Sequence, residues 1–493
     1  MDSCPENHLS HRDMWILAGI TSLSIGAYLA FSAIYHTIGF PLDDAWIHQT
    51  YARNLALHGE WAFIPGQPSG GSTAPLWSVF LAIGFWLRLA PYVWAYLLGA
   101  AALWGLEVLG EKTVRGIIPS YRPGFPWVGA VLALEWHLVW AASSGMETLL
   151  YSLLVIAVLT LIISGSQKYF AMGVLVGLSV WTRPDGITLL GAAALAVLLN
   201  QSTWMKRLKG LVSLSLGAGS LLALYLFFNL AISGSPLPNT FYAKQAEYAV
   251  YLKLPFLQRL GDEALQPLIG VGIILLPGMI LALITAIRQK KWGVLVSIVW
   301  MIGFLGLYAW RLPVTYQHGR YVIPAMPIFF LIGIVGLIEF DFNRGPRVGW
   351  VIPTFWKLAM GAVLVLFWGR GAVAYAQDVA VIDTEMVRTA KWVAANVPQN
   401  DLVAVHDVGA MGYFGDHNLV DLAGLVSPEV IPFLRDDELL AAYLNRQGVS
   451  YLVAFPDWYP KLTANLTLVF TTGAPYSRAF GEQNMAVYLW PNP

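Results

Sequence analysis

The run Leu42-Asp43-Asp44-Ala45-Trp46-Ile47-His48-Gln49-Thr50-Tyr51-Ala52-Arg53-Asn54 directly follows an apolar segment, residues 14–35, that is long enough to cross a bilayer. Two adjacent carboxylates at the mouth of a membrane helix are costly to place. Capping of a helix start explains one of these aspartates but not both. On a helix that begins near Asp44, His48 and Tyr51 share its face. The sequence therefore predicts that Asp43 and Asp44 act as a general base or as ligands of a divalent cation.

The composition is that of an integral membrane protein. Of the 493 residues, 57% are hydrophobic and only 12% are charged, whereas soluble domains carry about 25% charged residues. The 29 basic and 29 acidic residues cancel, which argues against nucleic acid as a partner. The single cysteine, Cys4, permits no intrachain disulfide and no cysteine metal cluster.

Eleven apolar segments are predicted to span the membrane. They are residues 14–35, 92–110, 125–142, 148–164, 169–182, 187–200, 210–232, 265–287, 292–310, 321–339 and 350–369. A further segment, Pro75–Leu89, is predicted to lie in the interface or to dip into the membrane and return, because the basic clusters of alternate loops then share one side, taken as cytoplasmic. These clusters are Lys112/Arg115/Arg122, Lys168, Lys206/Arg207/Lys209, Arg288/Lys290/Lys291 and Arg344/Arg347. The first outer loop then covers residues 36–91.

The outer side collects a different set of side chains. Its loops carry Asp, Glu, His, Arg, Tyr and Asn, and they comprise residues 143–148, 182–186, 233–262 and 311–321 besides the first loop. After residue 370 the composition becomes that of a small α/β module, with helices at 383–396 and 437–445 and strands at 402–405, 419–422, 449–455 and 485–490. We therefore expect a transmembrane domain, residues 1–369, and an extracytoplasmic α/β domain, residues 370–493, with the chemistry on the outer face.

Three basic side chains of the outer loops are candidates for binding a phosphate. Arg320 is the strongest, because a guanidinium matches phosphate oxygens bidentately; a plain interfacial arginine is the alternative. Lys244 lies where a lipid-linked phosphate would be, although snorkelling to the interface also explains it. Arg183 could bind phosphate or simply pair with Asp185.

Five further side chains are candidates for contacting a sugar or an acceptor: His48, Tyr51, Glu147, Tyr242 and His318. Glu147 stands at the start of a predicted membrane helix, where capping that helix is an equally good explanation. The turn-rich run from Pro65 to Pro75 could bring backbone N–H groups to a phosphate, but an ordinary loop explains most of it.

These motifs together resemble the membrane glycosyltransferases of the GT-C superfamily. The opening run, His58-Gly59, Pro65-Gly66 and residues 73–77 carry the resemblance, and residues 145–148, 182–186, 236–244, 320–321, 403–415 and 421–425 extend it over nearly the whole chain. The closest subgroup looks like the bacterial branch with the terminal arabinofuranosyltransferases of mycobacterial cell walls. The resemblance implies a polyprenyl-phosphate sugar donor and an acceptor glycan, lipid or protein at the outer face of the plasma membrane.

The resemblance also assigns roles to residues. It places the catalytic acid in the pair Asp43-Asp44, with Asp43 favoured, and maps phosphate ligands onto Lys244 and Arg320. Mg²⁺ or Mn²⁺ held by the pair is a further role that the carboxylates could serve. Interfacial helices in the first outer loop, as such enzymes have them, agree with the expectation for Pro75–Leu89.

Two other functions stay open at this point. A transporter or flippase of a lipid-linked sugar would need ionisable residues inside its spans. Glu107 and the pair Glu135 and His137 are candidates, although a buried hydrogen-bonded pair is the simpler explanation of the latter. A non-catalytic sugar-binding assembly protein would work through the α/β module. The sequence has no Walker A, HExxH or GxSxG motif, which argues against an ATP-driven pump, a zinc protease and a serine hydrolase.

Overall fold

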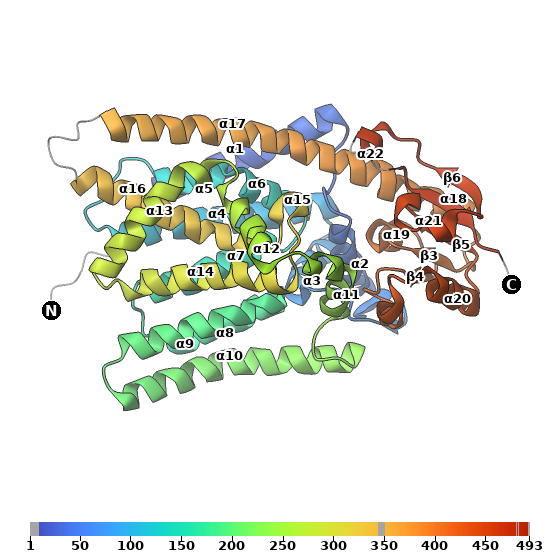
Figure 1. The fold of residues 1–493 in the computed structure, drawn as a ribbon, viewed down its shortest axis with the longest axis horizontal. Helices are drawn as coiled ribbons and strands as arrows, with labels where there is room; N and C mark the ends of the chain where they lie inside the picture. Colours follow the sequence, from blue (N-terminus) through green and yellow to red (C-terminus); the bar gives the residue numbers. More distant parts are fainter. Residues whose placement is uncertain (1–8, 344–350, 480, 482, 492–493) are drawn as a thin grey trace.

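The protein is a bundle of long helices with a small mixed sheet at one end (Figure 1). The computed structural model describes residues 9–343, 351–479, 481 and 483–491. Cys4 and the predicted basic cluster at Arg344 and Arg347 lie outside these residues. The sheet lies at one end of the bundle, and the short helices α2, α3 and α11 lie between the bundle and the sheet (Figure 1).

The helical part contains every predicted membrane segment. Its elements are α1 (His11–Tyr35), α2 (Asp44–His58), α3 (Pro75–Trp86), α4 (Pro91–Ile117), α5 (Trp127–Leu134), α6 (Trp136–Ala142), α7 (Thr148–Ile163), α8 (Tyr169–Thr182), η1 (Pro184–Ile187), α9 (Thr188–Asn200), α10 (Trp204–Ser233), α11 (Asn239–Glu247), η2 (Ala249–Lys253), α12 (Phe256–Leu265), η3 (Gln266–Leu268), α13 (Val271–Arg288), α14 (Trp292–Arg311), α15 (Tyr316–Gly319), η4 (Ile323–Ala325), α16 (Met326–Asn343) and α17 (Val351–Ile382). A small hairpin of β1 (Ala62–Ile64) and β2 (Gln67–Pro68) follows α2.

Seven of the described helices are long and apolar enough to cross a membrane, by length and composition. They contain α1, α4, α10, α13, α14, α16 and α17. Three other predicted spans are the shorter apolar helices α7, α8 and α9. Helix α3 has 12 residues, about 18 Å at 1.5 Å per residue, which is too short for a hydrocarbon core of about 30 Å and agrees with an interfacial position.

The one remaining predicted span, residues 125–142, is not one continuous helix. Glu135 separates α5 from α6 with an extended backbone (φ −70°, ψ 119°), and its carboxylate caps α6 by accepting a hydrogen bond from the Leu138 amide at 3.1 Å. The same carboxylate bonds to His137 at 2.9 Å. The prediction of a single helix is therefore wrong at this point, and Glu135 pairs with Nδ1 of His137 inside the fold.

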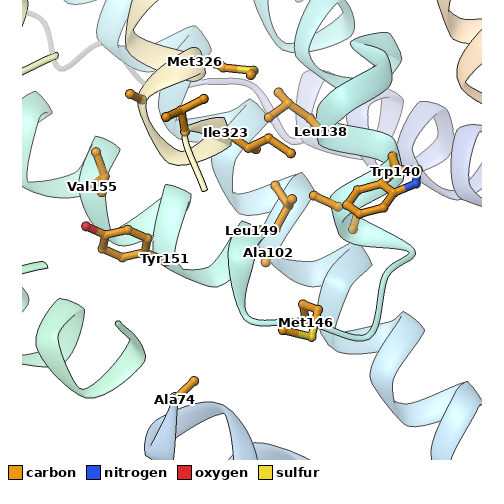
Figure 2. Packing of buried hydrophobic residues seen from close by; sticks show 14 of the residues in the cluster. Ala74, Ala102, Leu138, Trp140, Met146, Leu149, Tyr151, Val155, Ile323 and Met326 are labelled. Carbon is orange, nitrogen blue, oxygen red and sulfur yellow. The ribbon is translucent and has the colours of Figure 1, made fainter. Parts of the chain in front are cut away.

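One hydrophobic core runs from the bundle into the C-terminal domain. Figure 2 shows part of this core, where Leu149 of α7 lies near Ile323 and Leu138. Elsewhere helices pack closely through glycines: a Cβ added to Gly336 of α16 would lie 1.8 Å from the Gly278 carbonyl oxygen of α13. Small residues at such contacts are typical of membrane helix pairs.

Helix α17 passes residue 370, the predicted domain boundary, without a break. It continues through a π-helical turn, η5 (Asp383–Val387), into α18 (Arg388–Asn396). The rest of the C-terminal domain contains β3 (Val403–Val405), α19 (Val408–Phe414), β4 (Leu419–Asp421), η6 (Pro428–Phe433), α20 (Asp437–Gln447), β5 (Tyr451–Ala454), η7 (Pro456–Trp458), α21 (Pro460–Thr463), β6 (Thr467–Thr471), α22 (Pro475–Ala479) and β7 (Ala486–Leu489). The sheet has the order β4-β3-β5-β7-β6, with β3 parallel to β4 and β5, and β7 antiparallel to β5 and β6. All predicted strands are present, and β6 is the one that the sequence analysis missed.

Candidate active site

A cavity of about 340 Å³ lies where the loops predicted to be outer meet the C-terminal domain. Its size falls within the range of small-molecule sites. Six of the ten predicted site residues line it: Asp44, His48, Glu147, Arg183, Lys244 and Arg320. Leu425 of the C-terminal domain closes one side. Loops that are distant in the sequence, and that the positive-inside rule predicts to share one side, thus meet at one cavity.

Arg320 supplies the least satisfied group in the cavity wall. Its Nη2 donates to Asp44 Oδ2 at 2.7 Å and to the Tyr321 hydroxyl at 3.0 Å. Its Nε and Nη1 are buried and have no hydrogen-bond partner. Buried donors without partners are rare in folded proteins, and a guanidinium with two unpartnered nitrogens matches an anion with several oxygens.

Lys244 and Arg183 add positive charge to the same wall. Lys244 lies on α11, where its Nζ is 3.4 Å from Glu247 Oε2. Burial is the largest single influence and opposes its charge, but Glu247 and the other neighbours, Asp44 among them, together outweigh burial and raise the pKa of Lys244 well above its usual value. Arg183 makes the predicted pair with Asp185 at 3.1 Å and also lines the cavity, so the structural pair is confirmed and phosphate binding stays a prediction.

Asp44 is the first residue of α2 and faces the cavity. Burial by itself would raise the pKa of Asp44, but Arg320 and then Lys244 outweigh it and lower the pKa to about 2. Asp44 is therefore ionised at neutral pH and remains able to accept a proton or a hydrogen bond.

Asp43, its neighbour, points elsewhere. The residue occupies the N-cap position of α2, yet its side chain makes no cap bond there. Instead its two oxygens accept hydrogen bonds from the amides of Gly409 at 2.7 Å and Ala410 at 2.8 Å, at the start of α19. Burial and then Asp407 raise the pKa of Asp43 to about 8, while these two amides oppose the shift. The geometry thus separates the two carboxylates, and it favours Asp44 over Asp43 as the group that meets a substrate.

Glu147 and His48 lie side by side in another part of the cavity wall. Glu147 Oε1 is 3.6 Å from Arg183 Nη1, and Oε2 is 3.6 Å from His48 Nε2 and has no hydrogen-bond partner. His48 Nδ1 lies within hydrogen-bond distance of the hydroxyls of Ser72, 3.2 Å, and Ser78, 3.1 Å. Burial is the largest influence on His48 and lowers its pKa, which favours a neutral imidazole.

Three predicted sugar contacts are not in the cavity wall. Tyr51 is buried, and its hydroxyl accepts from the Gly71 amide at 2.9 Å and bonds to Ser69, so it holds the glycine-rich run in place. The Tyr242 ring lies against Phe241. His318 turns towards α17, where its Nε2 lies 2.8 Å from Asp378 Oδ2.

Two cavity residues were missed by the sequence analysis. Tyr308 lies inside a predicted span, yet its hydroxyl joins Arg183 Nη2, 2.7 Å, to Asp185 Oδ2, 2.9 Å. Arg311 ends the same helix and donates to Gln245 at 2.7 Å. The only signal in the sequence is a polar end to an apolar helix, which is too common at membrane interfaces to identify a site.

Asp43 and Asp44 do not converge on a shared metal position, because Asp43 is occupied by the amides of α19. Among the described residues, no group of three His, Cys, Asp or Glu side chains could hold a metal ion. A divalent cation entering the cavity would meet the carboxylates of Asp44 and Glu147. The use of Mg²⁺ or Mn²⁺ stays a prediction.

Comparisons with known proteins bear on the fold of the chain. A family model described as a domain of unknown function, DUF8728, matches residues 376–488, whereas no curated protein sequence matches the chain significantly. ArnT from Cupriavidus metallidurans, solved with undecaprenyl phosphate bound, has 14% identity and a TM-score of 0.55 over 96% of this chain and 98% of its own.

Two other solved structures are similar. The oligosaccharyltransferase of Archaeoglobus fulgidus has 10% identity and a TM-score of 0.54 over 94% of this chain and 73% of its own. The arabinofuranosyltransferase AftD from Mycobacteria has 16% identity and a TM-score of 0.52 over 100% of this chain and 42% of its own. All three are GT-C glycosyltransferases. The chain therefore has the GT-C membrane fold, as its motifs predict.

Proposed function

We propose that the protein transfers a monosaccharide from a polyprenyl phosphate to a hydroxyl group of an acceptor glycan, lipid or protein, on the outer face of the plasma membrane. The observation that carries this proposal is the pair of unpartnered guanidinium nitrogens, Nε and Nη1, of Arg320 beside the ionised Asp44. An anion site and a carboxylate in one cavity are what this transfer needs. The undecaprenyl phosphate bound by ArnT supports a lipid phosphate as the donor.

The cations stabilise the leaving group in this mechanism. As the bond between the anomeric carbon and the phosphate oxygen breaks, its electron pair stays on the lipid phosphate. Arg320 donates to the phosphate oxygens, and Lys244 and Arg183 add charge from the same wall. Fixed charges in a cavity shielded from water stabilise such developing charge strongly.

Asp44 acts as the base. It accepts the proton of the acceptor hydroxyl while the oxygen forms the new bond to the anomeric carbon, in one inverting displacement. Glu147, with its unpartnered oxygen, binds hydroxyls of the transferred sugar. The phosphate can be neutralised without a divalent cation, because four basic side chains line the cavity: Arg183, Lys244, Arg311 and Arg320.

The residues that would favour a transporter have structural partners. Both oxygens of Glu107 lie 2.8 Å from the Thr21 hydroxyl, and Glu135 caps α6 and bonds to His137. The assembly-protein alternative is weakened by Leu425, because the C-terminal domain helps to enclose the cavity instead of standing apart from it.

The test is transfer by the purified full-length protein. Mass spectrometry of the lipid that copurifies with the protein identifies the donor sugar. The matching polyprenyl-phosphate sugar is then synthesised as the donor, and labelled methyl glycosides serve as acceptors. We expect Asp44→Asn to lower the rate by at least about 100-fold and Glu147→Gln to lower it less, while Asp416→Asn, at an exposed site, changes nothing.

Two results would contradict the proposal. Normal transfer by both Asp44→Asn and Glu147→Gln would remove the carboxylate base. Substrate-dependent counterflow in proteoliposomes, without transfer from any polyprenyl-phosphate sugar, would identify a transporter instead.

A further inference from the structure

A second cavity, of about 180 Å³, lies beside the first. Residues 313–316 line it, and they directly follow Arg311 and Leu312, which line the first cavity. The remaining lining residues come from η2 and α12: Tyr251, Leu254, Arg259, Asp262 and Glu263. None of these residues has a role in the transfer mechanism above.

Glu263 is the most unusual group in this cavity. It is 0% exposed, and neither carboxylate oxygen has a hydrogen-bond partner. Burial and then Asp262 raise the pKa of Glu263 to about 8, while the amide of Val314 opposes this shift. A buried polar group without a partner costs free energy, so this position is costly unless a ligand completes it.

Arg259 presents an unsatisfied donor to the same space. Its Nη1 donates to the Ala309 carbonyl oxygen at 2.7 Å, but its Nε is buried and has no partner. Arg259 and Glu263 are one helical turn apart on α12, where such pairs normally join, yet no ion pair forms between them in the described structure.

This combination of groups selects a ligand class. A simple cation would be repelled by Arg259, and a simple anion would be repelled by Asp262 and by Glu263 when it is ionised. A hydroxyl group both donates and accepts, so it can satisfy Glu263 and Arg259 together. We propose that the second cavity is a binding subsite for a neutral sugar residue.

Aromatic rings connect this subsite to the first cavity. The rings of Tyr251 and Tyr248 stack with centroids 6.2 Å apart, and the Tyr248 ring lies 5.6 Å from the Tyr316 ring. Lys244, in the wall of the first cavity, places its Nζ 5.6 Å from the centre of the Tyr248 ring. Aromatic faces offer large apolar contacts that suit a sugar ring. The strip suits an acceptor glycan whose inner residue occupies the subsite while its end reaches Asp44; this role, unlike the subsite itself, rests on the proposed function.

The test measures binding, with the full-length protein in detergent micelles. Saturation-transfer NMR is recorded with the methyl glycosides of mannose, galactose, glucose and arabinofuranose, and with tetramethylammonium and inorganic phosphate as charged controls. We expect at least one glycoside to bind. Glu263→Leu should weaken that binding roughly tenfold, and Glu263→Gln, which keeps a donor and an acceptor, should preserve it within about threefold.

Tyr316→Leu gives a second measurement at a partly exposed position, and it should weaken the same glycoside roughly fivefold. The proposal is overturned if no glycoside binds, if binding is unchanged in both Glu263→Leu and Tyr316→Leu, or if tetramethylammonium binds in place of the glycosides and loses its signal in Glu263→Leu. Glycoside binding that depends on Glu263 in a protein without transfer activity would retain the subsite and reject the proposed function. Transfer activity without glycoside binding that depends on Glu263 would retain the proposed function and reject the subsite.

Discussion

Asp43 should prove to be a docking residue, and its replacement should loosen α19 from α2. In Asp43→Asn one oxygen still accepts an amide, but the new NH₂ group faces the other amide donor. One hydrogen bond is lost and one buried N–H stays unsatisfied, a loss of about 2–4 kcal/mol. The undocked fraction should then rise roughly 30- to 1,000-fold, because 1.4 kcal/mol corresponds to a factor of ten.

Hydrogen exchange of the peptide covering residues 406–415 measures this opening directly, because local exchange reports the population of the open state. Gly409→Ala perturbs the same contact without touching the carboxylate. Its added Cβ would lie 2.1 Å from the Asp43 carbonyl oxygen, so we expect comparably faster exchange. Asp416→Asn, exposed and just beyond α19, is the matched control and should exchange as the unaltered protein does.

One result would refute this reasoning. If Asp43→Asn leaves exchange of residues 406–415 unchanged within about threefold and yet abolishes transfer, Asp43 is the reacting carboxylate and its two amide bonds are incidental. Loss of transfer in Gly409→Ala together with faster exchange would instead support the docking role, because that variant keeps both aspartates.

Three further predictions follow from the same contacts. Arg320→Gln should lower kcat/KM at least about 100-fold and, by removing the main influence that lowers the pKa of Asp44 to about 2, should move the acidic limb of the pH–rate profile to higher pH. His318 has φ 61° within a turn that carries Arg320, and its bond to Asp378 holds this strained backbone. Asp378→Asn should therefore raise the donor KM roughly tenfold, with a smaller change in kcat. An unchanged KM would contradict this role of Asp378. EDTA should lower transfer by less than about threefold, because basic side chains already neutralise the phosphate, and full loss restored by Mg²⁺ would show that a cation is required.

The sequence predicts the bundle well because hydropathy and loop charge are local signals. It fails at Glu135, since a hydropathy window averages over one glutamate and cannot show that its carboxylate caps a helix. It also misses β6, whose residues are mostly exposed and lack the alternation of a half-buried strand.

The site is predictable only in part for a related reason. Loop charge places Asp44, Glu147 and Arg320 on one side, and the structure brings them to one cavity. The division between Asp43 and Asp44 has no local signal, because the group that occupies Asp43 stands 366 residues later in the chain. Likewise, the hydroxyl of Tyr308 becomes a cavity group only through its contact with Arg183.

Because α17 passes without a break into the C-terminal domain, it couples the orientation of the sheet rigidly to that of the helix bundle. Each residue added to an α-helix turns whatever follows by about 100° and advances it by about 1.5 Å. A single insertion in the exposed stretch near Val365 would thus swing the sheet around the helix axis, away from α2. The angular register of one membrane helix therefore determines whether the cavity closes, even though no residue of that stretch touches it.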